Sequence, residues 1–402
     1  MREKFTNRDI TSEVSIQESR IISFDRKDNV CYSFRVYRDG VVGIHYQEGD
    51  MSDEEGFARA EKNLALNRPY PYDLETGVRH RDKTELQLKD GDILDFAREI
   101  MDVVRTRYPR FSFSGSFGQY ISIIAAENSK GMDYSNRDCH TTLTLMYKHA
   151  DSKNIDDGGF DISLRSYDKE KVFELIDNNL ANYENVLEIP DDIIIMNQYY
   201  GYLGLIKESL NAESLALGTS LFTGKIGERV FSPEFSLIHD VSDENCWDNT
   251  FFDGEGVVLE GDRLPYIENG VILRGYADKR IAEKYNVPCT GSAWRNFSDI
   301  PSNGKVNLTI KRSAKTVKEL LDGRLCIIPV YAAGGGFNEK GDYVTPVQMS
   351  FLCDGEKILG RLPEFTLATN MYEMFGDGFI GVGSDQPVFN DKSILFRAHR
   401  GK

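Results

Sequence analysis

Apolar and polar residues alternate in the first part of the chain, as they do in antiparallel strands. Cys31–Tyr37 is one such run, and Arg38-Asp39-Gly40 supplies a turn before a second run, Val41–Tyr46. Alternation places one set of side chains on each face of a sheet, and an Asp-Gly pair favours a tight hairpin. The pattern predicts an antiparallel meander over residues 13–49.

Three segments of the first half instead repeat their apolar residues every three to four positions, which is the period of a helix. Ser52, followed by acidic residues, predicts a helix start, because carboxylates stabilise the first turn. The apolar positions between Ile93 and Val104 predict a second helix over 92–108, which Pro109 ends. A third amphipathic helix is expected at 168–183.

Two more strands are predicted at Phe111–Ala126 and Thr141–Lys148, joined by the turn-rich stretch Asn128–Asp138. Runs of strands followed by helices indicate an α+β arrangement rather than a regular alternation of strand and helix.

The second half of the chain begins after the polar stretch Ala181–Asp192. One long helical region is expected at Tyr199–Ala216, followed by short strands and turns such as Glu268-Asn269-Gly270. The predicted fold class is α+β with two domains. An N-terminal domain of mixed α/β layers spans 1–187, and a β-rich, antiparallel C-terminal domain with a few helices spans 188–402.

The composition is that of a globular protein and excludes one class of partner. Apolar residues make up 40% and charged residues 28% of the 402 residues, and the net charge is −16. Nucleic-acid binding needs a field of the opposite sign, and no run rich in Lys or Arg is present. We therefore expect no nucleic-acid partner.

Location signals are also absent from the sequence. The first residues have no apolar core typical of a secretory signal, and no stretch reaches the roughly 20 apolar residues that span a bilayer. The six cysteines stand singly, without a Cys-x-x-Cys pair, which favours reduced thiols. A cytoplasmic protein without membrane contact is expected.

The histidines do not indicate a metal site. No two of the six are three to five residues apart, the spacing that places two ligands on one face of a helix. His140 and His149 are nine positions apart on a predicted strand, which sends them to opposite faces. The glycine-containing segment Gly218–Ile226 does not fit a phosphate loop either, since Ile226 stands where a hydroxyl is required.

Asp253 and Glu255 are the most notable pair of carboxylates. On a strand, residues two apart point to the same side. Such a pair could receive a peptide amine or an arginine from a ligand. It could equally pair with Arg295 as a structural bridge.

Several short motifs of the second half occur in a fixed order. They are Gly218-Thr-Ser, Phe252-Asp-Gly-Glu-Gly, Ile267-Glu-Asn-Gly, Thr290-Gly-Ser-Ala-Trp-Arg-Asn296, Gly341-Asp-Tyr343 and Thr366-Leu-Ala-Thr-Asn-Met371. Together they resemble the C-terminal half of the TldD/PmbA family, also called TldD/TldE or "modulator of DNA gyrase" proteins. The resemblance covers about residues 200–400.

The resemblance implies one of two kinds of chain. One kind is a metallopeptidase that binds zinc through a His-Glu-x-x-x-His helix and a later cysteine. The other kind, TldE or PmbA, lacks these ligands and pairs with the first. If Glu208 occupies the glutamate position of the motif, Lys207 and Ala212 stand where the histidines should be. An ammonium repels a dication and a methyl group cannot ligate one, so this chain resembles the metal-free kind.

The resemblance therefore implies a PmbA/TldE-like subunit that acts on unfolded peptides with a TldD-like partner. Zinc is expected only in that partner, and no cofactor in this chain. Glu208 is the only catalytic candidate. The candidates for binding an extended peptide are Asp253, Glu255, Arg295, Asn296, Asp342 and Asn370.

Two other interpretations remain open. One is a stand-alone peptide-binding or scaffold homodimer without catalytic activity. The other is a metal-free hydrolase that uses Glu208 or the Asp253/Glu255 pair, since paired carboxylates can do acid–base work when their environments separate the pKa values.

Overall fold

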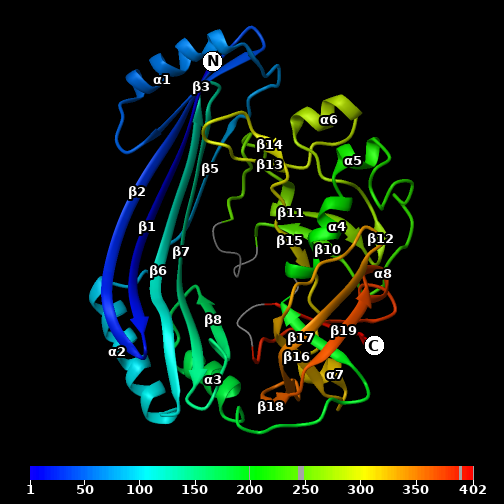
Figure 1. Ribbon diagram of the computed structural model, residues 1–402. Helices are drawn as coiled ribbons and strands as arrows, with labels where there is room; N and C mark the ends of the chain where they lie inside the picture. Colours follow the sequence, from blue (N-terminus) through cyan, green and yellow to red (C-terminus); the bar gives the residue numbers. More distant parts are fainter. Residues whose placement is uncertain (199, 243–248, 389–391, 402) are drawn as a thin grey trace.

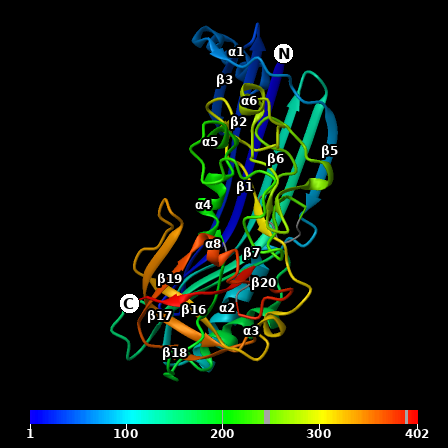
Figure 2. The same ribbon diagram turned by 90° about the vertical axis from the view of Figure 1, so that its right-hand side faces the viewer.

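The computed structural model describes residues 1–198, 200–242, 249–388 and 392–401. A long curved sheet from the first half of the chain stands beside a body built from the second half (Figure 1). Viewed from the side, the second half lies in front of this sheet (Figure 2). The predicted α+β fold is confirmed.

Within the described residues, the first sheet has eight strands, with antiparallel pairing except between β5 and β7. In spatial order they are β4 (Arg68–Pro69), β3 (Val41–Glu48), β2 (Arg20–Arg38), β1 (Arg2–Gln17), β6 (Phe111–Asn128), β7 (Met132–His149) and β5 (Gly77–Lys83), with β8 (Gly158–Leu164) also paired with β7.

The predicted meander is confirmed, and its turn is the expected one. Asp39 and Gly40 join β2 to β3 with positive φ angles of 51° and 75°. The prediction that Asn128–Asp138 forms turns was wrong, because β6 runs to Asn128 and β7 begins at Met132. Residues 133–138 pair with β6 on one side, and 132–138 pair with the parallel strand β5 on the other, a contact that the local sequence does not reveal.

The three predicted helices of this half are confirmed at α1 (Asp53–Lys62), α2 (Asp90–Arg107) and α3 (Lys169–Leu180). Ser52 caps α1 by accepting a hydrogen bond from the backbone of Glu55, and a 3₁₀ turn, Asn63–Leu66, follows. Helices α2 and α3 lie side by side, and Tyr108 Oη donates to Asp177 Oδ1 over 2.6 Å.

The buried face of the long sheet changes along its strands. At one end, the cross-strand row Val14–Phe117–Leu143 is buried in the same cluster as α2 and α3. At the other end, the row Phe5–Ala126–Tyr134 is buried against Phe251 and Phe252 of the second half. On each strand the two rows are nine residues apart, so they point to opposite faces. The sheet therefore contacts helices with one face and the second half with the other.

The second half contains another eight-stranded sheet in the described residues, with a parallel contact between β9 and β16. Its strands are β20 (Phe379–Val382), β21 (Ser393–Arg397), β9 (Ile194–Gln198), β16 (Cys326–Ala332), β17 (Asp342–Cys353), β19 (Phe365–Asn370) and β22 (His399–Arg400), with β18 (Ile358–Leu362) on β17.

Smaller elements complete the second half. A four-stranded sheet holds β12 (Val271–Ile272), β11 (Arg263–Glu268), β10 (Leu237–Asp240) and β15 (Leu308–Ile310), and β13 (Ala293–Trp294) pairs with β14 (Ser302–Asn303). The helices are α4 (Gly204–Ser209), α5 (Ala212–Ala216), α6 (Lys279–Tyr285), α7 (Val317–Leu321) and α8 (Met371–Met374), with 3₁₀ turns at Tyr200–Tyr202 and Glu260–Asp262. The Asn269-Gly270 hairpin is confirmed, with φ angles of 49° and 78°.

The predicted helical region Tyr199–Ala216 was wrong in one respect. Tyr199 lies outside the described residues, and the rest forms a 3₁₀ turn and the two short helices α4 and α5. Leu210 ends α4, and Asn211 takes an extended conformation and caps α5. A side-chain cap at Asn211 competes with continuation of the helix, and apolar periodicity alone does not reveal it.

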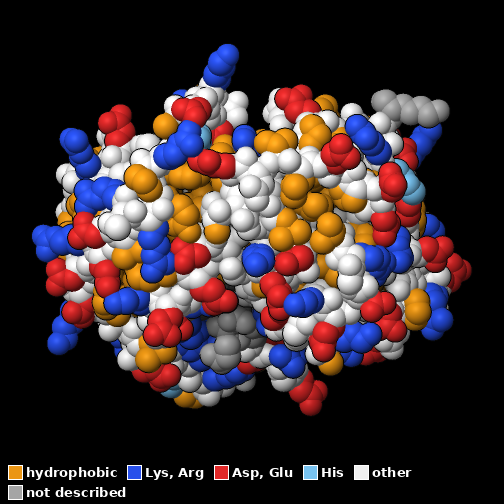
Figure 3. Space-filling view, turned by 90° about the horizontal axis from the view of Figure 1, so that it is seen from below, with side chains coloured by type: hydrophobic (Ala, Val, Ile, Leu, Met, Phe, Trp, Pro, Cys, Tyr) orange, Lys and Arg blue, Asp and Glu red, His pale blue; other side chains and the backbone are white. Residues whose placement is uncertain are grey.

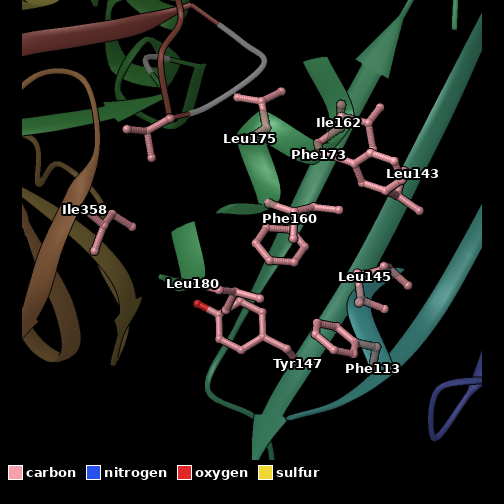
Figure 4. Close-up of a cluster of buried hydrophobic side chains, with 14 of the residues drawn as sticks. Phe113, Leu143, Leu145, Tyr147, Phe160, Ile162, Phe173, Leu175, Leu180 and Ile358 are labelled. Atoms are coloured by element: carbon pink, nitrogen blue, oxygen red, sulfur yellow. The ribbon is translucent and has the colours of Figure 1, made fainter. Parts of the chain in front are cut away.

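One hydrophobic core joins the two halves. Helix α3 lies between the long sheet and β18, with Leu175 and Leu180 between Phe160 or Tyr147 on one side and Ile358 on the other (Figure 4). The opposite face of the second sheet packs on the four-stranded sheet through residues such as Ile327 and Tyr266. The boundary at 187/188 lies in the segment between α3 and β9, and the two-domain division at that point stays a prediction.

The surface carries both charge signs. On the lower face, Lys and Arg side chains are interspersed with Asp and Glu around small hydrophobic areas (Figure 3). Cys31, Cys139, Cys289, Cys326 and Cys353 are free thiols, and Cys246 lies outside the described residues. In the described part of the chain, no helix combines the length and the hydropathy that crossing a bilayer requires.

The shared core leads to a first prediction. Replacing Leu175, which is 1% exposed, with Ala is expected to lower the free energy of unfolding by about 2–5 kcal/mol. Chemical denaturation followed by circular dichroism measures this loss. Because the core spans both halves, we expect a single transition. The exposed neighbour Glu174→Ala serves as the control, and two separate transitions in L175A would contradict a shared core.

Candidate functional site

The Asp253-Gly254-Glu255-Gly256 motif is a turn that Asp253 organises. Its Oδ1 accepts hydrogen bonds from the backbone N–H groups of Glu255 (2.8 Å) and Val257 (2.9 Å). Its Oδ2 accepts from the N–H of Ala293 at 2.9 Å. The expectation that Asp253 and Glu255 lie on a strand was therefore wrong, since a carboxylate that accepts from the following N–H groups closes a turn instead.

Glycine is required at Gly254. A Cβ atom at this position would lie 2.8 Å from the backbone of Arg295. The turn therefore presses directly against the segment 293–297, and both contact the long sheet.

Glu255 connects this turn to the first half of the chain. It is 3% exposed, and its two carboxylate oxygens accept from Tyr70 Oη (3.0 Å) and from the N–H of Lys279 (3.0 Å). Burial, together with repulsion from Asp253, raises the pKa of Glu255 to about 8. Burial and this repulsion therefore favour the neutral form of the Glu255 carboxyl.

A buried arginine completes the contact. Arg35 of β2 is fully buried and donates from Nη1 to the carbonyl of Gly254 (3.2 Å) and from Nη2 to that of Asn296 (3.1 Å). Glu3 balances its charge with Oε2 at 3.4 Å, and Tyr37 Oη donates to the same oxygen over 2.6 Å. The group Glu3, Arg35, Tyr37, Tyr70, Asp253 and Glu255 is called the junction cluster below.

Lys305 lies behind the Asp253 turn. Its Nζ donates to Thr250 Oγ1 (2.6 Å) and to the carbonyl of Phe252 (3.2 Å). Burial, followed by repulsion from Arg295, lowers the pKa of Lys305 to about 7. The adjacent cavity, also lined by His239, has a volume of only about 10 Å³. It has room for a water molecule but not for a peptide group.

Four of the six predicted peptide-binding residues meet at this junction. Besides Asp253 and Glu255, Arg295 Nη2 donates to Thr250 Oγ1 over 3.3 Å, and the Asn296 carbonyl accepts from Arg35. The described side chains of Asp253 and Arg295 form no direct ion pair. The two side chains therefore do not make the structural bridge considered from the sequence. Backbone groups, rather than Arg295, occupy the Asp253 oxygens.

Asp342 and Asn370 lie elsewhere, opposite each other on β17 and β19 next to α8. Asn370 Nδ2 donates to Asp342 Oδ1 over 2.9 Å, and Asn338 Nδ2 donates to Oδ2 over 3.2 Å. Both pairs are solvent-exposed. The structure therefore divides the six candidates into a buried group at the junction and an exposed group at this strand end.

The segment that would correspond to a zinc helix does not fit the metal. Lys207 and Glu208 are on α4, whereas Ala212 begins α5 after the break at Leu210–Asn211. The two positions therefore do not share one helix, as the ligands of a His-Glu-x-x-x-His helix would. Among the described residues, no three His, Cys, Asp or Glu side chains gather as a metal site. Glu208 itself is exposed on α4, away from Asp253 and Glu255.

The comparison with known families decides the relationship. Residues 192–394 match the family model described as the PmbA/TldA metallopeptidase C-terminal domain. The chain belongs to the PmbA/TldD family. The resemblance seen in the motifs is thereby confirmed, and the chain is related to metallopeptidases.

Individual relatives of this PmbA/TldD chain support the family assignment. Its fold is similar to that of TldE from Thermococcus kodakarensis, with a TM-score of 0.81 over 99% of this chain and 96% of that chain at 18% identity. An uncharacterized protein of Methanocaldococcus jannaschii is 24% identical over 90% of this chain and 86% of its own length. The metalloprotease TldD homolog of Buchnera aphidicola is 26% identical over 53% of this chain and 44% of its own length.

Sequence reasoning missed part of the junction cluster in this family member. Arg35 stands at a polar position of the alternating run Cys31–Tyr37, so the local pattern predicts an exposed side chain and does not reveal its burial. Glu3 and Tyr70, like the adjacent Lys305, carried no local signal either, since their partners are far away in the chain. Chemically, the junction cluster holds two halves together and presents no free nucleophile or base to a substrate.

The raised pKa of Glu255 leads to a second prediction. Between pH 4.5, its usual pKa, and about 8, the folded chain holds a proton that the unfolded chain releases. Stability from this group is therefore full below pH 4.5 and falls as pH rises, by up to ~1.4 kcal/mol per pH unit. Glu255→Gln, which imitates the protonated form, should make unfolding free energy less dependent on pH.

The difference between Glu255→Gln and the wild type, measured between about pH 5 and 7, isolates this effect. The lowered pKa values of His140 and His239 affect both proteins alike, and the lowered pKa of Lys305 acts only above about 7. Glu283→Gln, on the exposed side of α6, is the matched control and should leave the profile unchanged. A Glu255→Gln variant with the slope of the wild type would refute the assignment.

Proposed function

We propose that this chain is the metal-free, TldE-like subunit of a two-chain peptidase that acts on unfolded peptides. A TldD-like partner with a His-Glu-x-x-x-His helix would carry the zinc and perform the hydrolysis. This chain would contribute a rigid wall and peptide-binding surface. We place the complex in the cytoplasm and expect no cofactor in this chain.

One observation carries the proposal. If Glu208 occupies the glutamate position of the motif, Lys207 and Ala212 take the ligand positions, and they lie on different helices because α4 ends at Ser209. An ammonium and a methyl group supply no lone pair to a cation. Catalysis by a metal therefore requires a second chain.

The remaining chemistry of the chain supports a binding role rather than independent hydrolysis. Asp253 and Glu255 have relative exposures of 2% and 3%, and internal donors occupy their oxygens. Glu208 is exposed on α4. The exposed group at Asp342 and Asn370 retains accessible polar atoms that an extended peptide can contact.

A co-expression experiment tests the proposal. The tagged chain should co-purify with a His-Glu-x-x-x-His family member, and only the pair should contain zinc and cleave an unfolded peptide such as β-casein. Stoichiometric zinc and chelator-sensitive cleavage by the isolated chain would sink the proposal. A stable homodimer that ignores the partner would favour the scaffold interpretation.

A designed variant sharpens this prediction. Lys207→His with Ala212→His restores the residue types of the motif, but the helix break keeps the two imidazoles from sharing one ion. We expect the isolated double variant to bind no zinc at micromolar metal, as measured by elemental analysis after dialysis. Lys207→Ala with Ala212→Ser controls for folding. Zinc bound at one ion per double-variant chain would show that the break does not prevent a site.

A further inference from the structure

The strand β2 has a long unpaired edge. Its residues Cys31–Arg38 pair with β3, and β3 ends at Glu48. Beyond that point, in the described part of the chain, residues 20–29 of β2 pair only with β1. Unpaired strand edges recruit other strands, and most proteins cover or shorten them.

Backbone geometry identifies which groups of this edge are free. The carbonyl of Val30 accepts from the N–H of Gly49 on the outer side of the strand. Because both main-chain groups of a residue point to the same side and successive residues alternate, Phe24, Arg26 and Asp28 also direct their N–H and C=O groups outward. A bulge in the β1–β2 pairing near Ile16 and Ile21 limits this regular stretch at its lower end.

Apolar side chains along this edge are exposed to solvent. Ile22 is 59% exposed and Phe24 is 37% exposed. The two charged residues that point their main-chain groups outward are paired within the chain, since Arg26 pairs with Asp90 at 3.0 Å and Arg8 holds Asp28 through two hydrogen bonds of 2.7 and 2.6 Å. These charges therefore do not repel an incoming strand strongly.

An open hollow of about 1010 Å³ lies where β3 ends and the free edge begins. Its lining contains the carboxylates of Asp9, Glu48 and Asp50, all exposed and, among the described residues, without a cation at ion-pair distance. The guanidinium of Arg8 in the same lining is already engaged by Asp28. The hollow is thus negatively charged and complements a basic side chain.

We propose that the outer edge of β2 from Phe24 to Val30 adds an extended peptide as a further strand, with a Lys or Arg side chain of the peptide in this hollow. The peptide would continue the line of β3, and main-chain hydrogen bonds would hold it without further sequence choice. This inference rests on the proposed function and names a peptide site for it. It lies apart from the junction cluster and from Asp342.

Proline at position 26 tests the edge selectively. The Arg26 N–H points outward, so Arg26→Pro removes a donor from the free edge and none from the β1–β2 ladder. Arg26→Ala loses the same ion pair with Asp90 but keeps the N–H. Fluorescence anisotropy with the full chain and a labelled, blocked peptide of alternating Thr and Val with one central Lys gives the affinities.

We expect R26P to weaken binding at least about tenfold and R26A to change it less than about threefold. Glu48→Gln with Asp50→Asn should reduce the preference for this peptide over its central-Glu counterpart. In the wild type, hydrogen exchange should show new protection at the amides of Phe24, Arg26 and Asp28 when peptide binds. This measurement keeps the test valid if R26P does not fold.

The outcomes separate the two proposals. Equal binding by folded R26P, or peptide-induced protection confined to other strands, overturns the edge site while leaving the proposed function intact. Conversion of a wild-type dimer into R26P monomers with unchanged peptide binding assigns the edge to a second copy instead. Lack of peptide binding by the wild type, alone and with its partner, overturns the proposed function as well.

Discussion

The arrangement of the whole molecule depends on one buried cation. Arg35 lies in the buried part of β2, and its guanidinium reaches carbonyl groups of Gly254 and Asn296 in the second half of the chain. A fully buried guanidinium is tolerated only when its charge and its donors are matched, and removing one partner of such a pair costs about 3–5 kcal/mol. Glu3 supplies the charge, and the Asp253 turn supplies the acceptor in the correct place. The halves are thereby fixed in one register.

The long sheet makes this contact compatible with a conventional core. Because the buried face changes along its strands, one end packs on α2 and α3 and the other end on the second half. Helix α3 then lies between two sheets, and hydrophobic burial is continuous from the first half into the second. The polar junction provides orientation, while the apolar layers provide most of the stability.

The same physics changes the meaning of motifs that look catalytic in the sequence. Two carboxylates separated by one glycine suggest acid–base chemistry. Asp253 instead closes a turn, and Glu255 accepts a hydrogen bond from Tyr70. The segment 204–216, which reads as one helix in the sequence, is split by an Asn cap. Two surfaces that remain available to a ligand are a strand end at Asp342 and Asn370 and the free edge of β2. Both suit an extended chain better than a small molecule.

Local patterns in the sequence were sufficient for the α+β class, the β2–β3 hairpin, the three amphipathic helices and the Asn269-Gly270 turn. Each depends on interactions within a few residues, such as the cap at Ser52 or a positive φ at Gly40. The ordered motifs were sufficient for the family. Only the tertiary structure decided that 132–138 pairs with β5, that Leu210 and Ala212 pair with Tyr276 where α4 ends, and that Glu3, Arg35, Tyr70 and Glu255 meet. Those outcomes depend on partners tens to hundreds of positions away, whose burial and hydrogen bonds override the local preference.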